Sequence, residues 1–129
     1  MKKFIQAIVF CLAGISMAAQ AADSRVVELW HCELEEGATM EQVAAANGKW
    51  LTFVNNTVED GEIRSYAMES IVGESGPFVF VDTFPGKMAW ATAKEALETP
   101  EGKAVEAGFK GLWKCSKNRL YKSTQHMPG

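Results

Sequence analysis

The stretch of residues 25–34, RVVELWHCEL, constrains the fold of this chain more than any other. It is rich in β-branched and aromatic residues, which favour a strand. Both of its alternating faces begin with apolar side chains, a pattern typical of a central strand that is covered on both sides. The remaining elements are therefore expected to pair with this strand or pack on it.

Apolar spacing and turn residues divide the rest of the chain into six further elements. Thr39 and Gln42 form a capping-box pattern that starts a helix at residue 40. Gly73 and Gly76 mark a hairpin loop, and Pro100 suits the first turn of a helix. The predicted elements are helix 40–55, strand 63–72, strand 78–84, helix 87–98, helix 100–110 and strand 118–124.

This order, strand–helix–strand–strand–helix pair–strand, is the ferredoxin-like βαββαβ pattern of α+β domains. It predicts a four-stranded antiparallel sheet covered by helices on one face. Right-handed crossovers place the last strand beside the first and the first beside the third. One domain is expected over residues 22–129, with residues 124–129 as a frayed tail.

The N-terminal 21 residues have the three-part pattern of a cleavable signal peptide. Lys2 and Lys3 precede a mostly apolar run, and Ala19-Gln20-Ala21 fits the cleavage site. A membrane anchor is the alternative, but the apolar run is shorter than the roughly 20 residues that a span needs. The sequence therefore predicts a periplasmic or secreted protein that has no membrane attachment after cleavage.

Two cysteines, Cys32 and Cys115, remain after removal of the segment that contains Cys11. An even number of cysteines in an exported protein predicts a disulfide. The predicted topology also brings the end of the first strand near the start of the last, where these cysteines lie. Free buried thiols are the alternative. No metal site is expected, because two cysteines without clustered histidines fall short of the usual ligand set.

Charge excludes some partners. The predicted signal peptide carries two of the 13 Lys and Arg and none of the 16 Asp and Glu, which leaves a mature chain with 11 basic and 16 acidic residues. A weakly acidic chain without a basic run argues against nucleic acid and anionic membrane as partners.

The element order, the covered strands and the length resemble the dimeric α/β-barrel superfamily, and in particular antibiotic-biosynthesis-monooxygenase-like domains. The resemblance covers nearly all of the mature chain and rests on element order. It implies a homodimer in which two sheets face each other, and no cofactor. Asn47 and Trp50 are similar in type to the Asn and Trp of some of those monooxygenases. The signal peptide and the cysteine pair depart from those mostly cytoplasmic enzymes.

Three residues are candidates for catalysis: Asn47, His31 and Asp82. Asn47 interrupts an apolar helix stripe and could hold a ligand carbonyl, or could simply bond the backbone of a strand or loop. His31 could act as a base, or be a histidine at the rim of the sheet. Asp82 lies among phenylalanines, where burial would raise its pKa and suit it to proton transfer. An ion pair, or a contact with the helix N-terminus just before Lys87, is the alternative for Asp82.

A second group of residues could line a ligand pocket. Arg64 and Tyr66 share a strand face and could meet an anionic or phenolic ligand, or could face solvent on an edge strand. Four tryptophans and seven phenylalanines could line an aromatic cavity, or fill a core and a dimer interface. The tryptophans are Trp30, Trp50, Trp90 and Trp113.

No catalytic constellation stands out, so the sequence favours an exported, dimeric module that is structural or binds a small apolar or aromatic ligand. The alternative is a cofactor-independent monooxygenase-like enzyme acting on a small aromatic compound. A homodimer is expected because helices on one face of the sheet would leave the other face, with its apolar residues, uncovered.

Overall fold

The computed structural model describes residues 24–59 and 61–129. The predicted signal peptide and its cleavage site lie outside the described residues. No helix in the described part of the chain is long and apolar enough to cross a membrane. The elements, in order, are β1 (Ser24–Leu34), α1 (Met40–Thr57), β2 (Arg64–Glu69), β3 (Pro77–Phe84), α2 (Lys87–Leu97), α3 (Pro100–Ala107) and β4 (Trp113–Thr124).

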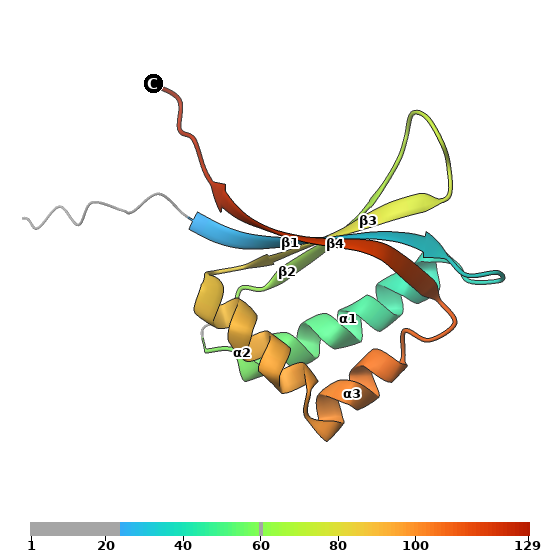
Figure 1. Ribbon diagram of the computed structural model, residues 1–129, viewed down its shortest axis with the longest axis horizontal. Coiled ribbons are helices and arrows are strands. Elements are labelled where there is room, and N and C mark those ends of the chain that lie inside the picture. Colours follow the sequence, from blue (N-terminus) through green and yellow to red (C-terminus); the bar gives the residue numbers. More distant parts are fainter. Residues whose placement is uncertain (1–23, 60) are drawn as a thin grey trace, which may run out of the picture.

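The four strands form one antiparallel sheet in the order β2-β3-β1-β4. The three helices lie together on one face of this sheet, and the other face is open (Figure 1). The predicted ferredoxin-like α+β fold is thereby confirmed, including the pairing of β1 with both β3 and β4. β1 is one of the two interior strands of the sheet, together with β3, as its composition indicates.

Two strands, β4 and β2, differ from their predicted bounds by more than two residues. β4 begins at Trp113, not at residue 118, so Cys115 lies within the strand and not before it. Backbone pairing with β1 carries the polar segment 114–117 into the sheet despite its low strand propensity. β2 ends at Glu69, where its pairing with β3 stops. Ile71 and Val72, predicted to continue β2, are almost fully exposed in the following loop.

A disulfide joins Cys32 of β1 to Cys115 of β4, as predicted. The two residues are direct cross-strand partners, with 3.9 Å between their Cα atoms. The register of the two strands shifts between His31 and Cys32, which marks a β-bulge beside the bridge. The bridge therefore ties the C-terminal strand to the centre of the sheet.

Local sequence explains how the helices begin. Thr39 and Gln42 form the predicted capping box at the start of α1. Thr99 caps α3 by accepting a hydrogen bond from the backbone N–H of Gly102, and Pro100 occupies the first turn. The buried faces of the helices and the sheet form two clusters. One contains Val26, Trp50, Val54, Val58, Ile63, Phe84, Ala93 and Leu97, and the other Cys32, Val43, Phe78 and Phe80.

Gly102 marks the close approach of α3 to the end of α2, and its replacement gives a first prediction. A Cβ atom at this position would lie 2.4 Å from the Ala96 carbonyl oxygen and from the Leu97 Cα atom. Because both are backbone atoms, the helices must shift, and we expect Gly102→Ala to lower the free energy of unfolding by about 1–3 kcal/mol or more. Urea denaturation measures this change.

The matched control is Gly48→Ala in α1, where a Cβ atom would meet nothing within 4 Å. There the loss of glycine's conformational freedom should stabilise the protein by about 0.5–1 kcal/mol. Equal effects of the two substitutions would contradict the close packing of α2 and α3.

Candidate functional site

Two buried carboxylates lie side by side beneath the helices. Glu28 of β1 and Asp82 of β3 are direct partners in the sheet, and only 3% and 6% of their surfaces are exposed. Each interrupts an otherwise apolar strand face, because side chains two residues apart point to the same side. Two acids on neighbouring strands at one level of the sheet are costly to bury unless polar groups compensate them.

Glu28 is compensated by three donors. The Lys94 ammonium of α2 lies 2.7 Å from its Oε2 atom. The Trp90 indole N–H donates to the same oxygen over 3.3 Å, and the Asn118 amide of β4 donates to Oε1 over 2.9 Å. This carboxylate therefore links β1, α2 and β4, and its interactions are those of a structural ion pair.

Asp82 has a different environment. Its Oδ1 atom accepts a hydrogen bond of 2.5 Å from the Ser65 hydroxyl, which in turn accepts one of 2.8 Å from the Asn47 side-chain amide. Burial raises the pKa of Asp82 to about 6, and the charge of Glu28 adds to the rise. The Ser65 hydrogen bond and Lys94 oppose that rise. Asp82 is thus a carboxyl group that changes charge near neutral pH.

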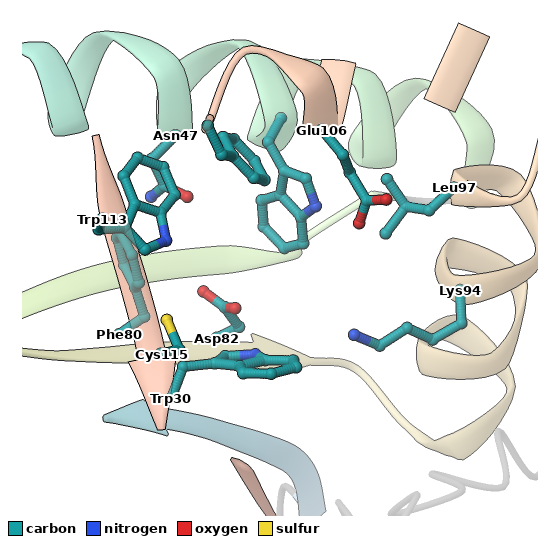
Figure 2. A pocket seen from close by; sticks show the side chains of 11 residues that line it. Trp30, Asn47, Phe80, Asp82, Lys94, Leu97, Glu106, Trp113 and Cys115 are labelled. Carbon is teal, nitrogen blue, oxygen red and sulfur yellow. The ribbon is translucent and has the colours of Figure 1, made fainter. Parts of the chain in front are cut away.

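A cavity of about 170 Å³ lies between the sheet and the helices, next to Asp82 (Figure 2). All three helices and strands β1, β3 and β4 contribute residues to the lining, and Phe109, just after α3, adds to it. Its wall combines aromatic rings with four polar or charged groups. The lining residues are Trp30, Asn47, Trp50, Phe80, Asp82, Lys94, Leu97, Glu106, Phe109, Trp113 and Cys115.

Asp82 and Lys94 face each other across part of this cavity (Figure 2). The Asp82 carboxylate rises from the sheet toward the helices, and the Lys94 chain extends inward from α2 over the Trp30 ring, 5.4 Å from its centroid. On the α3 side, partial burial raises the pKa of Glu106 above its ordinary value, while Lys94 opposes the rise. Glu106 and Phe109 keep part of their surface in solvent, so the cavity reaches the surface at α3.

The structure brings together four of the residues singled out in the sequence. Trp30, Asn47, Trp50 and Asp82 all line the cavity. Trp113 joins them, whereas Trp90 bonds Glu28 nearby. Asn47 is half-buried and bonds a strand side chain, where a backbone partner was the alternative.

His31, Arg64 and Tyr66 lie elsewhere. The register places all three on the open face of the sheet, opposite the helices. Alternation explains this, because His31 follows the inward-facing Trp30, and Arg64 and Tyr66 flank the inward-facing Ser65. The cavity lining does not include these three residues.

Several groups at the site escaped sequence reasoning. Glu28 carries the same sequence signal as Asp82, a charged residue on an apolar strand face. Ser65, Lys94 and Glu106 have no such signal, since polar residues at these positions are ordinary on strands and helices. In the described part of the chain, no group of three or more His, Cys, Asp or Glu residues could hold a metal ion.

The raised pKa of Asp82 gives a second prediction. A carboxyl group with a higher pKa in the folded state binds its proton more tightly there, so its contribution to stability is complete below about pH 4 and is lost as pH rises through about 6. Asp82→Asn stays neutral and keeps an oxygen for Ser65. We expect the free energy of unfolding of the variant, relative to wild type, to increase by up to about 3 kcal/mol between pH 4 and pH 7.5.

Urea denaturation at a series of pH values measures this difference. Glu69→Gln, on an exposed position of β2, is the matched control and should follow the wild-type pH dependence. Parallel curves for Asp82→Asn and wild type would show that Asp82 is not held in an unfavourable charged state.

Comparisons with known proteins bear on the fold. No protein-family model matches the sequence, and a search of curated proteins finds no significant match. Among solved structures, SnoaB from Streptomyces nogalater, a cofactor-independent oxygenase, is similar with a TM-score of 0.59 and 12% identity over 84% of this chain and all of that one.

Two further structures are similar. A NIPSNAP family protein of unknown function from Agrobacterium tumefaciens has a TM-score of 0.56 and 14% identity, over 81% of this chain and 91% of that one. A protein of unknown function and possible oxidoreductase from Bacteroides thetaiotaomicron has a TM-score of 0.54 and 16% identity, over 79% of this chain and all of that one. At these identities the similarities show a shared fold, and it is the fold that the predicted resemblance implies.

Proposed function

We propose that this protein is an exported homodimeric module that binds a small apolar or aromatic molecule in the cavity beneath its helices. The observation that carries the proposal is the cavity itself, where aromatic rings surround a few convergent polar groups. A solid core would have closed this space with side chains. At about 170 Å³ it is smaller than the ~300–1,000 Å³ typical of sites for drug-sized ligands. The ligand is therefore a small molecule.

Two features support export and dimerisation. The N-terminal pattern of Lys2, Lys3 and an apolar run suits a secretory signal, and a disulfide suits an oxidising compartment. The open sheet face carries valines, a leucine, a methionine and tyrosines in neighbouring rows. A second copy of the chain would cover that face.

Nondenaturing mass spectrometry of the protein purified from its native host tests ligand binding. We expect a small molecule that is released on unfolding. Asn47→Trp, which fills the cavity from α1, should lose it. Lys49→Trp, on an exposed position of the same helix, should retain it. Wild-type protein without any bound molecule, or equal retention by both variants, would count against a ligand site in this cavity.

A second candidate function rests on the chain of hydrogen bonds from Asn47 through Ser65 to Asp82. A buried carboxylate with a pKa of about 6 is suited to act as a general base at neutral pH. Within an aromatic cavity it could take a proton from a phenol or an enol, as a cofactor-independent oxygenase acting on a small aromatic compound requires. Fold similarity to SnoaB does not by itself carry that activity.

Oxygen uptake separates the two functions. An oxygenase should consume O₂ with small hydroquinones, with a rate that rises as pH passes through about 6, because the base must be ionised. Asp82→Asn should abolish this uptake. A binding module should bind such compounds without consuming O₂.

A further inference from the structure

The charge of the cavity points to the kind of molecule that it holds. Among the described residues, Lys94 is the only cationic side chain in the lining, and the buried carboxylate of Glu28 lies 2.7 Å from its ammonium nitrogen. These two charges offset one another. The other two ionisable groups of the lining, Asp82 and Glu106, are both acids, and neither has an ion-pair partner among the described residues. The cavity is therefore net negative.

Asp82 keeps one oxygen for a ligand. Its Oδ1 atom accepts from Ser65, whereas Oδ2 accepts no hydrogen bond from any described residue. Only 6% of the Asp82 residue surface is exposed, and its carboxylate points from the sheet into the cavity (Figure 2). Because Oδ2 is open to a largely aromatic cavity, its negative charge is poorly solvated, and a positively charged group beside it would stabilise that charge.

Aromatic rings form most of the remaining wall. Phe80 and Phe109 both pack against Trp113, with ring centroids 5.2 and 4.6 Å apart. Trp30 already presents its ring face to a cation, the Lys94 ammonium, 5.4 Å from the centroid. Faces of tryptophan and phenylalanine attract cations through the ring quadrupole, and rings grouped around a site are how proteins recognise alkylated ammonium groups.

We propose that the cavity binds a small organic cation, with an alkylated ammonium group held between the Asp82 carboxylate and the tryptophan rings. This inference rests on the proposed function, that the cavity binds a small and largely apolar molecule, and adds that this molecule carries a positive charge on an alkylated nitrogen. Asp82 supplies the counter-charge, the rings of Trp50 and Trp113 supply an apolar wall that attracts cations, and Glu106 adds negative charge where the cavity reaches solvent. Lys94 stays paired with Glu28.

Three probes of one shape but different charge test the proposal. Choline is the cation, dimethylbutanol replaces its nitrogen by carbon, and dimethylbutyrate is an anion of the same branched shape. Isothermal titration of the disulfide-bonded protein measures their affinities, and tryptophan fluorescence reports occupancy, since three of the four tryptophans line the cavity. We expect choline to bind at least about tenfold more tightly than the other two.

Variants locate the effect. Asp82→Asn keeps the shape of the side chain and removes its charge, so choline affinity should fall at least about tenfold while dimethylbutanol affinity stays unchanged. Glu106→Gln should lower choline affinity by about two- to fivefold, because the group is partly screened by solvent. Glu101→Gln, exposed in the first turn of the same helix, is the matched control and should change nothing.

Several results would overturn the proposed cation site. Equal affinity for choline and dimethylbutanol would overturn the inference and leave the proposed function intact. Preferential binding of dimethylbutyrate would assign recognition to Lys94 and also overturn it. Choline binding that survives Asp82→Asn, or no choline binding at all, would reject the cation site. Mass spectrometry of the protein purified from its native host tests the proposed function independently of these titrations.

Discussion

Replacing Cys32 and Cys115 together by alanine is expected to lower the free energy of unfolding by about 4–5 kcal/mol. The bridge closes a loop with a sequence separation of 83 residues, and the chain-entropy model assigns this value to a loop of that length. Small domains have only about 5–15 kcal/mol in total. The double variant should therefore lose a large part of its stability, as measured by urea denaturation.

The mechanism predicts two further observations. Because the bridge restricts the unfolded chain, its removal should expose more surface on unfolding and increase the dependence of the free energy on urea concentration. Wild-type protein unfolded under reducing conditions is the control and should match the double variant. A loss below about 1 kcal/mol would mean that strand pairing around Cys32 holds β4 in place without the bridge.

The arrangement of the sheet follows from local patterns. β1 has the composition of a central strand, and the glycines, prolines and caps separate the elements, so element order and handedness leave few ways to assemble the sheet. The ends of strands are less predictable. Segment 114–117 reads as polar and irregular, but its partners on β1, which lie 81 to 86 residues away in the chain, bring it into the sheet. Ile71 reads as a strand residue but has no strand partner and is exposed.

The site was predictable only in part, for a related reason. Asp82, Asn47 and Trp30 stand out locally, because each is a polar or aromatic side chain placed conspicuously on an element face. What gives Asp82 its properties is not local. Ser65 and Glu28 reach it through strand register, and Lys94 reaches it from α2. His31 and Arg64 lie on the open face of the sheet, whereas Asp82 lies on the face that the helices cover. A shift of one residue in strand register would move a side chain from one face to the other.

The open face of the sheet carries the last prediction. At its centre, strands β1 and β3 place four apolar side chains that the helices do not cover: Val27, Leu29, Val79 and Val81. Tyr66, Met68 and Tyr121 extend the set and are about half exposed in the single chain. The opposite set, with Trp30, Phe78, Phe80 and Phe84, faces the helices. Neighbouring apolar side chains on an uncovered sheet face are typical of a protein–protein interface.

We therefore expect the protein to sediment as a dimer at micromolar concentration, and Leu29→Asp to convert it to a monomer. Stacked sheets bury the side chains between them, and a two-fold axis places the new carboxylate in the interface twice. An unpaired charge in each copy should weaken dimerisation by at least about 4 kcal/mol, which is about a thousandfold in the dissociation constant. Sedimentation equilibrium measures this change.

The fold of the single chain should survive the substitution, because the Leu29 side chain lies on the open face, away from the helices of its own chain. The circular dichroism spectrum should therefore stay unchanged. Met88→Asp introduces the same charge on an exposed position of α2, beyond the opposite face, and should leave the dimer intact. A wild-type monomer at tens of micromolar, or equal dimerisation of the two variants, would remove the open face as an interface. If Leu29→Asp alone dissociates the dimer, the interface lies on the sheet face, and each cavity, on the opposite side of its own sheet, belongs to a single copy.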